Sequence, residues 1–178
     1  MNERVYAPFI SEIKPYLYLG NFEAATDENI ILNFGIKRII SVTDMQGHRP
    51  DRAFCEKMRV EQTLFEIPDD TFADEEEGLV RFIFPSLSEN ESENKKVLVH
   101  CRASVSRSPS LIITYLMWRG MNFQDALLHV FSAHPIAAPK PQVLECFLKC
   151  IGIQLPESYI ETHRARFNQI WWQKMILY

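Results

Sequence analysis

The sequence predicts an α/β domain in which a central, mostly parallel, twisted sheet is flanked by helices. Short β-rich segments alternate with segments of helical periodicity along the 178-residue chain, which is typical of strands joined by crossover helices. The chain is also long enough to bury one core without disulfides or metals, so one main domain is expected.

Four segments are predicted to be strands because they are short, rich in apolar residues and bounded by turn residues. They are residues 16–19, 38–42, 62–67 and 97–99. The third is expected to end at Pro68, whose nitrogen has no hydrogen to donate to a neighbouring strand. Residues 88–96, SENESENKK, are expected to form a polar linker into the fourth.

Helices are predicted where apolar residues recur every three or four positions. The segments are residues 22–33, a helix beginning near Asp74, residues 109–119 and a helix beginning at Asn122. Gly35 and Gly120 suit the ends of the first and third, because glycine adopts a left-handed conformation at little steric cost. Asp74 and Glu77 form a capping-box-like pair at the start of the second.

Composition and charge exclude several classes of partner. The formal net charge is -4 and the pI is near 5.7, and no clustered basic face of the kind that a general nucleic-acid binder needs is evident.

The four cysteines form no CxxC pair and the histidines show no zinc-ligand spacing, so we expect no metal and a reducing, intracellular environment. No apolar signal segment or bilayer-spanning stretch is evident. We therefore expect the protein in the cytoplasm, with the nucleus as an additional location. We expect no membrane partner.

The chemistry is concentrated between the strand at 97–99 and the helix at 109–119, where the sequence is HCRASVSRS. The first amides of a helix have no partner within it, so a loop wrapped over that end forms a cradle for an anion. Cys101 is expected at the floor of this cradle, where the helix end and a nearby guanidinium favour the nucleophilic thiolate. Arg107 presents a planar fork that can hold two phosphate oxygens at once. The pair predicts a phosphate site with a nucleophile beneath it; the alternative is a buried structural cysteine beside a surface arginine.

The stretch from His100 to Ser108 strongly resembles the signature HCxxGxxR[ST] of the cysteine-dependent protein phosphatases. Three flanking segments resemble the dual-specificity subgroup of that family. They are YLYLGN at 16–21, GIKRIISVTD at 35–44 and SRSPSLIITYLM at 106–117. The resemblance covers residues 10–150, most of the chain, and implies a small, atypical member of the dual-specificity family.

The resemblance implies a signalling enzyme that hydrolyses phosphate monoesters on phosphoproteins, at phosphotyrosine and at phosphoserine or phosphothreonine. The route is a cysteinyl-phosphate intermediate, with no metal or other cofactor. Cys101 would be the nucleophile, Arg107 would hold the phosphate, and Ser108 would help the thiolate to leave. The loop backbone would bind the phosphate through Arg102, Ala103, Ser104, Val105 and Ser106. The Arg102 side chain would line the mouth of the site or lie in solvent, and His100 would orient the loop.

A general acid is needed to protonate the departing oxygen. In the resemblance this acid follows the strand at 62–67, which implies Asp70. Asp69 is a close alternative and Asp74 a more distant one, and all of them are also residue types common in turns and helix caps.

Two positions depart from the family pattern. Ser104 stands where the family usually has glycine, so the bend of the loop requires either a negative φ or some strain. Lys140 replaces a frequent asparagine beside the pocket. Ser104 leaves open a weak or inactive phosphate-binding adaptor. A phosphatase for a phosphoinositide, glycan or RNA phosphate is a third interpretation, disfavoured because the loop carries only Arg102 and Arg107 as cations.

The end of the chain lies beyond the resemblance. We expect residues 1–155 to form the catalytic domain and residues 156–178 a C-terminal helical extension. The spacing of seven residues suggests an amphipathic helix with an aromatic end; they are Tyr159, Ile160, His163, Phe167, Ile170, Trp171 and Leu177. The helix is expected to pack on the domain, or, if Trp171 and Trp172 are exposed, to form a homodimer or partner surface.

Overall fold

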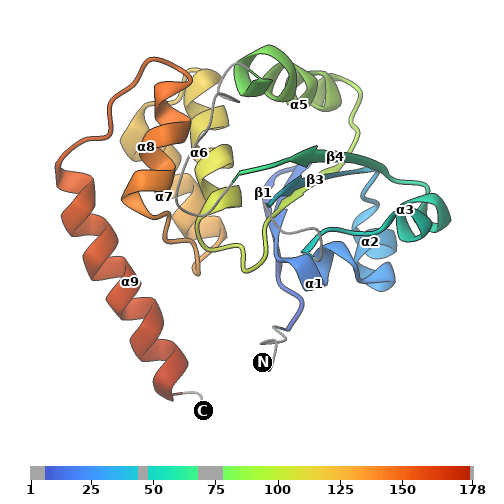
Figure 1. Cartoon of the computed structure of the whole chain (residues 1–178), viewed down its shortest axis with the longest axis horizontal. Coiled ribbons are helices and arrows are strands. Elements are labelled where there is room, and N and C mark those ends of the chain that lie inside the picture. Colours follow the sequence, from blue (N-terminus) through green and yellow to red (C-terminus); the bar gives the residue numbers. More distant parts are fainter. Residues whose placement is uncertain (1–6, 44–47, 68–77, 177–178) are drawn as a thin grey trace.

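The computed structural model describes residues 7–43, 48–67 and 78–176, with the side chains of the last helix described as far as Ile170. A five-stranded sheet runs through the centre, with helices on both faces (Figure 1). The strand order is β1-β2-β5-β3-β4, and every neighbouring pair is parallel except β1 with β2. The predicted α/β fold with a mostly parallel sheet is confirmed.

The sheet contains the four predicted strands and one more. The strands are β1 Ile10–Lys14, β2 Leu17–Gly20, β3 Arg38–Val42, β4 Glu61–Phe65 and β5 Val97–His100. β1 was not predicted. Its sequence, ISEIK, lacks the alternation of apolar and polar residues that marks a half-buried strand. Among its side chains only that of Ile13 is buried.

Helices account for most of the remaining described residues. They are α1 Phe22–Ala25, α2 Glu28–Phe34, α3 Arg52–Met58, the π-helical turn η2 Leu79–Ile83, α5 Phe84–Ser92, α6 Arg107–Trp118, α7 Phe123–Ala133, α8 Pro141–Lys149 and α9 Ser158–Ile176. Gly35 ends α2 at a φ of 68°, as predicted. The Asn122 side chain accepts from the amide of Asp125 over 2.9 Å and so begins α7, also as predicted. The predicted cap formed by Asp74 and Glu77 lies outside the described residues.

The predicted linker at 88–96 is wrong, because α5 continues to Ser92. The helix extends through this polar stretch because of side-chain hydrogen bonds, which an apolar pattern does not reveal. Asn90 is only 5% exposed, and its side-chain oxygen accepts from the Arg38 guanidinium over 2.9 Å. The same guanidinium donates to Ser86 over 2.9 Å. A partly buried polar network therefore ties α5 to β3. α3 was not predicted either; its first turn is capped by Asp51.

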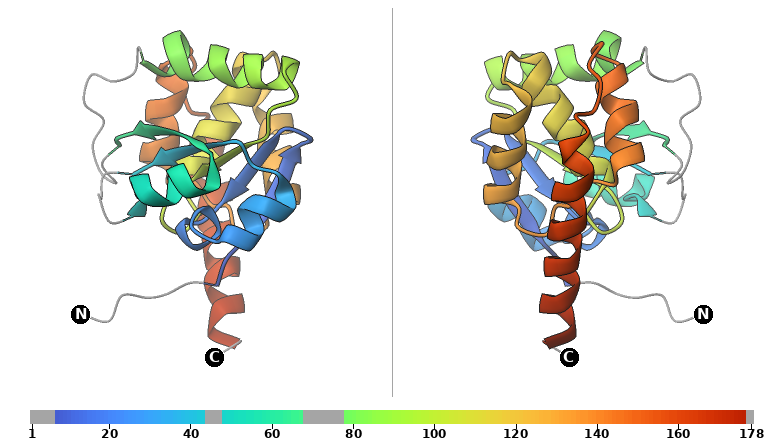
Figure 2. Two further views of the ribbon diagram at one scale, coloured as in Figure 1. Left: turned by 90° about the vertical axis from the view of Figure 1, so that its right-hand side faces the viewer. Right: turned by 90° about the vertical axis from the view of Figure 1, so that its left-hand side faces the viewer.

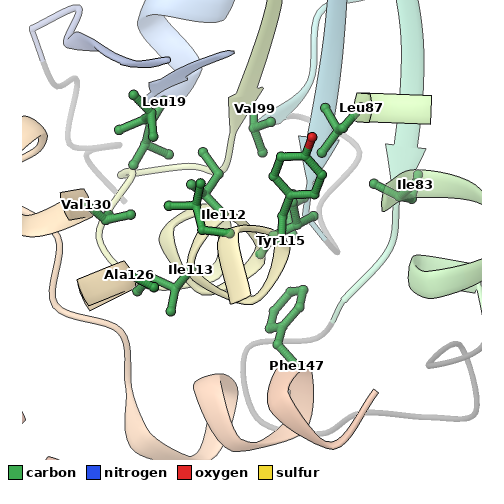
Figure 3. Close-up of a cluster of buried hydrophobic side chains, with 14 of the residues drawn as sticks. Leu19, Ile83, Leu87, Val99, Ile112, Ile113, Tyr115, Ala126, Val130 and Phe147 are labelled. Carbon is green, nitrogen blue, oxygen red and sulfur yellow. The ribbon is translucent and has the colours of Figure 1, made fainter. Parts of the chain in front are cut away.

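The two faces of the sheet carry separate apolar clusters, and β5 contributes to both. Val97 and Val99 belong to the larger cluster, under α6, α7 and α8, whereas Leu98 belongs to the smaller one, beneath α2 and α3. This follows from the alternation of side chains along a strand. α6 lies at the centre of the larger cluster, where Ile112 and Tyr115 are fully buried (Figure 3). The loop that joins β5 to α6 is thus anchored at both ends in the core.

α9 begins against the domain and then extends beyond it (Figure 2). Tyr159, in its first turn, is 2% exposed, whereas Ile160 and Phe167 are 50% and 37% exposed. The expected apolar face therefore packs mainly through Tyr159. The side chains of Trp171 and Trp172 lie outside the described part, so the partner surface expected there stays a prediction. Within the described ranges, no helix has the length and apolarity needed to cross a membrane.

Candidate active site

The loop of residues 101–106, called here the cysteine loop, connects the end of β5 to the start of α6. The order strand, loop, helix is the one that the sequence predicts. Ser106, immediately before α6, forms no side-chain cap on its own helix, and its hydroxyl instead accepts from the backbone amide of Lys140 over 2.9 Å. The Ser106 side chain therefore does not occupy the first amides of α6, which are the groups that favour an anion.

Cys101 and Ser108 are brought together at the base of this loop. The Ser108 hydroxyl donates to the Cys101 sulfur over 3.1 Å, and both residues are buried. A hydroxyl donor stabilises a negatively charged sulfur more than a neutral one, because hydrogen bonds to charged acceptors are stronger. The contact therefore places a hydrogen-bond donor against the sulfur, where it can stabilise negative charge.

Arg107 lies in the first turn of α6 and is 5% exposed. One terminal nitrogen of its guanidinium donates to the carbonyl of Ile67 over a long 3.4 Å. The contact brings the chain that follows β4 next to the cysteine loop at Ile67. The predicted acid Asp70 and its alternatives Asp69 and Asp74 lie outside the described residues, so their placement is not tested.

The carbonyls of Arg102, Ser104 and Val105 in the cysteine loop accept hydrogen bonds from parts of the chain that are distant in the sequence. The donors are the Phe22 amide to the Arg102 carbonyl at 3.1 Å, His134 Nε2 to the Ser104 carbonyl at 3.1 Å, and the Ala138 amide to the Val105 carbonyl at 2.8 Å. In a planar trans peptide the C=O and N–H groups point in opposite directions. The amides of Ala103, Val105 and Ser106 consequently face away from these donors, as the amides of an anion-binding loop must.

Ser104 has a left-handed backbone conformation in the cysteine loop. Its φ is +58°, which a residue with a side chain rarely adopts, and it is fully buried. Its hydroxyl has no hydrogen-bond partner among the described residues. The structure therefore decides between the two conformations that the sequence left open: the serine follows the strained path that glycine takes more easily.

His134, at the end of α7, is a residue that sequence analysis missed. Because a carbonyl only accepts, Nε2 must carry the hydrogen donated to Ser104, and Nδ1 then accepts from the Ser11 hydroxyl over 2.9 Å. Burial lowers the pKa of His134 to about 4, which keeps the imidazole neutral. No local motif marks His134, because its partners are distant in the sequence.

His100 is hydrogen-bonded in the way expected of an orienting residue. Its Nε2 lies 2.8 Å from the Ser41 hydroxyl, and its Nδ1 lies 3.4 Å from the Cys101 carbonyl. Burial lowers the pKa of His100 to about 4. The neutral ring therefore links β3 to the base of the cysteine loop.

The remaining predicted residues of the loop, Arg102 and Ala103, are partly exposed. In the described ranges, no group of three or more His, Cys, Asp or Glu side chains is placed to hold a metal ion. The arrangement can bind an oxyanion through backbone amides and a guanidinium, above a sulfur that a hydroxyl stabilises.

Comparison with known proteins gives a consistent result. Residues 17–148 match the family model described as "Dual specificity phosphatase, catalytic domain". The chain is 31% identical over 163 residues to Protein-tyrosine-phosphatase MKP1 of Arabidopsis thaliana, covering 86% of this chain and 20% of that protein. It is 31% identical over 134 residues to Dual specificity protein phosphatase 1 of Arabidopsis thaliana, covering 72% of this chain and 62% of that protein. The chain thus spans less than two thirds of either relative.

The fold is also found among solved structures. The crystal structure of human DUSP28 aligns with a TM-score of 0.68 at 24% sequence identity, covering 82% of this chain and 94% of that one. The aligned part includes most of the described chain, so the shared fold extends well beyond the cysteine loop.

Proposed function

The chain belongs to the dual specificity phosphatase family, and from this premise we propose that it hydrolyses phosphate monoesters on phosphoproteins through a cysteinyl-phosphate intermediate. The observation that carries the proposal is the hydrogen bond from Ser108 to the Cys101 sulfur, beneath a loop whose carbonyls are held outward. The loop amides can then hold a phosphate with the sulfur below it, a position suited to in-line attack.

In the first step the Cys101 thiolate attacks phosphorus, and the bond from phosphorus to the leaving oxygen breaks. The amides of the cysteine loop and the Arg107 guanidinium stabilise the equatorial oxygens as charge develops on them. Asp70 transfers its proton to the leaving alcohol or phenol.

In the second step a water molecule attacks the cysteinyl phosphate, and Asp70, now a carboxylate, accepts the proton of that water. The bond between sulfur and phosphorus breaks and leaves a thiolate at Cys101. The Ser108 hydroxyl stabilises this leaving group, so Ser108 contributes mainly to the second step. Inorganic phosphate then departs.

The charges near the loop support a phosphoprotein substrate over a highly anionic headgroup. The side chains of the loop and the first helical residue include two cations, Arg102 and Arg107, and Arg107 lies buried at the base. A phosphoinositide or other polyphosphorylated substrate needs more positive charge than this.

A second candidate function is a phosphate-binding module with low turnover. The positive φ of Ser104 favours it, as does a buried hydroxyl without a partner among the described residues, because a strained loop need not hold the geometry of the transition state. Binding a phosphate in its ground state is less demanding than stabilising the transition state.

The test is single-turnover hydrolysis of an aryl phosphate and of a doubly phosphorylated peptide, with a chelator present. We expect turnover by the native chain, none by Cys101→Ser, and slower release from the peptide than from the aryl phosphate in Asp70→Asn, because an alcohol needs a proton more than a phenol does. Cys146→Ser, in α8, is the matched cysteine control. A native chain that binds the phosphopeptide without releasing phosphate would overturn the proposal in favour of the binding module.

A further inference from the structure

α9 lies outside the matched family region, yet two peptide groups connect it to the cysteine loop. The connection runs through residues 137–140, a short segment between α7 and α8. On one side this segment contacts α9, and on the other side it contacts the cysteine loop.

The first connection is the peptide group between Ala137 and Ala138. Its carbonyl accepts from the Nε of Arg166 in α9, while its amide donates to the carbonyl of Val105 over 2.8 Å. Because the C=O and N–H of a trans peptide point in opposite directions, one rigid unit is held from both sides.

The second connection repeats this arrangement two residues further along the segment, at the peptide group between Pro139 and Lys140. The carbonyl of Pro139 accepts from the Tyr159 hydroxyl over 2.9 Å, and the amide of Lys140 donates to the Ser106 hydroxyl over 2.9 Å. Tyr159 is 2% exposed, and burial raises its pKa, so its hydroxyl keeps the proton that it donates. The fixed ring of Pro139 further limits the freedom of this unit.

Arg166 also holds the chain that leads to this segment. Its guanidinium donates to the carbonyl of Pro135 over 2.9 Å and lies 3.8 Å from the centre of the Phe131 ring. The same guanidinium donates to the Phe131 carbonyl over 3.4 Å. One side chain of α9 therefore fixes both the end of α7 and the start of the segment.

We propose that α9 positions the cysteine loop through these two peptide groups, with Arg166 and Tyr159 as positioning residues. The loop carbonyl and hydroxyl that the segment holds belong to Val105 and Ser106. Their amides are among those directed toward the anion, so a shift of the segment changes phosphate binding directly. The proposal rests on the proposed function in that it takes the cysteine loop to be the phosphate site.

The test compares Tyr159→Phe and Arg166→Met with Arg164→Met, a matched control on the exposed side of the same helix. The measurements are tungstate affinity by calorimetry, kcat/KM with an aryl phosphate, and thermal unfolding. We expect tungstate affinity and kcat/KM to fall about tenfold in the first two variants, because each loses a hydrogen bond that orders the loop, and to be unchanged in the control. Tyr159→Phe removes only a hydroxyl and keeps the packing, so it tests the proposal even if Arg166→Met unfolds.

A purely structural role would lower the unfolding temperature without changing tungstate affinity, and that result would overturn the proposal. The route is tested by adding Tyr159→Phe to Ser106→Ala. Since Tyr159 acts through Ser106, its effect should largely disappear in that background, whereas full additivity would contradict the route.

The two proposals fail in different ways. A native chain that binds tungstate but releases no phosphate refutes the phosphatase, while the tungstate affinities of the variants still decide the role of α9. A native chain that does neither overturns both. Turnover that is lost in Cys101→Ser but unchanged in Tyr159→Phe and Arg166→Met refutes the role of α9 alone.

Discussion

The hydroxyl of Ser108 lies 3.1 Å from the sulfur of Cys101, inside the first turn of α6 and beneath the cysteine loop. This contact stabilises the sulfur when it is negative, which is the state before attack and again after the phosphate is released. Removal of the Ser108 hydroxyl should therefore affect both the attack on the phosphate and the release of the thiolate.

The first prediction concerns Ser108→Ala. We expect kcat to fall roughly 10- to 100-fold, as the loss of a hydrogen bond to a charged group predicts, with hydrolysis of the intermediate slowed most. Rapid-quench kinetics should then show a burst of released phenol. The control is Thr114→Val in the same helix, α6. It removes a buried hydroxyl that has no hydrogen-bond partner among the described residues. A linear time course with a native kcat would contradict the role of Ser108.

The second prediction concerns Ser104→Gly. Glycine removes the strain of a φ of +58° together with a buried hydroxyl that has no partner in the described part of the chain, but it adds freedom to the unfolded chain. We expect the free energy of unfolding in urea to rise by about 1 kcal/mol. Ser104→Ala, which loses the hydroxyl but keeps the strain, should gain less. Equal gains in the two variants would show that the backbone is not strained.

The third prediction is the pH dependence of stability. The pKa values of His100 and His134 are lowered to about 4 by burial, from an ordinary value of 6.5. Between these limits the unfolded chain binds protons that the folded chain does not, so the free energy of unfolding decreases as the pH falls from 6.5 towards 4. The loss should be roughly 2–3 kcal/mol for each histidine.

This prediction is checked by urea unfolding at a series of pH values. His134→Gln retains a side-chain amide that can donate to the Ser104 carbonyl, but it cannot titrate. Its loss of stability between pH 6.5 and 4 should be smaller than that of the native chain by the share that His134 contributes. An unchanged slope would show that His134 is not held neutral.

The fourth prediction concerns Asn90→Ala in α5. The variant takes one acceptor from the partly buried Arg38 guanidinium and should reduce the free energy of unfolding by about 2 kcal/mol. Ser92→Ala, an exposed change in the same helix, should have little effect. A comparable loss in both would indicate that helix propensity, rather than the buried hydrogen bond, holds α5 in place.

The parts of the fold that the sequence predicts are those with a local apolar pattern. β5 is a fully buried short run, β3 is buried apart from Arg38, and the ends of α2 and α6 are marked by Gly35 and Gly120. The cysteine loop is predictable for a similar reason, since its chemistry is contiguous in the sequence. Each of these features is determined by a sequence pattern of a few neighbouring residues.

The parts that were missed depend on partners far away in the sequence. α5 continues through SENES because Asn90 contacts Arg38, 52 positions earlier. His134 becomes part of the site because it contacts Ser11 and Ser104, at separations of 123 and 30 positions. Such contacts are set by tertiary packing and leave no periodic signal in the chain.

The division of the core between the two faces of the sheet has a consequence for oxidation. Cys55 belongs to the cluster under α2 and α3, whereas Cys101 belongs to the cluster on the other face. A disulfide needs Cα atoms within about 7 Å, which a separating sheet prevents in the folded chain. A sulfenic acid formed at Cys101 by peroxide would therefore not be captured by Cys55. A small thiol from solution can instead form a mixed disulfide with it and release water, and a second thiol then restores the Cys101 thiol.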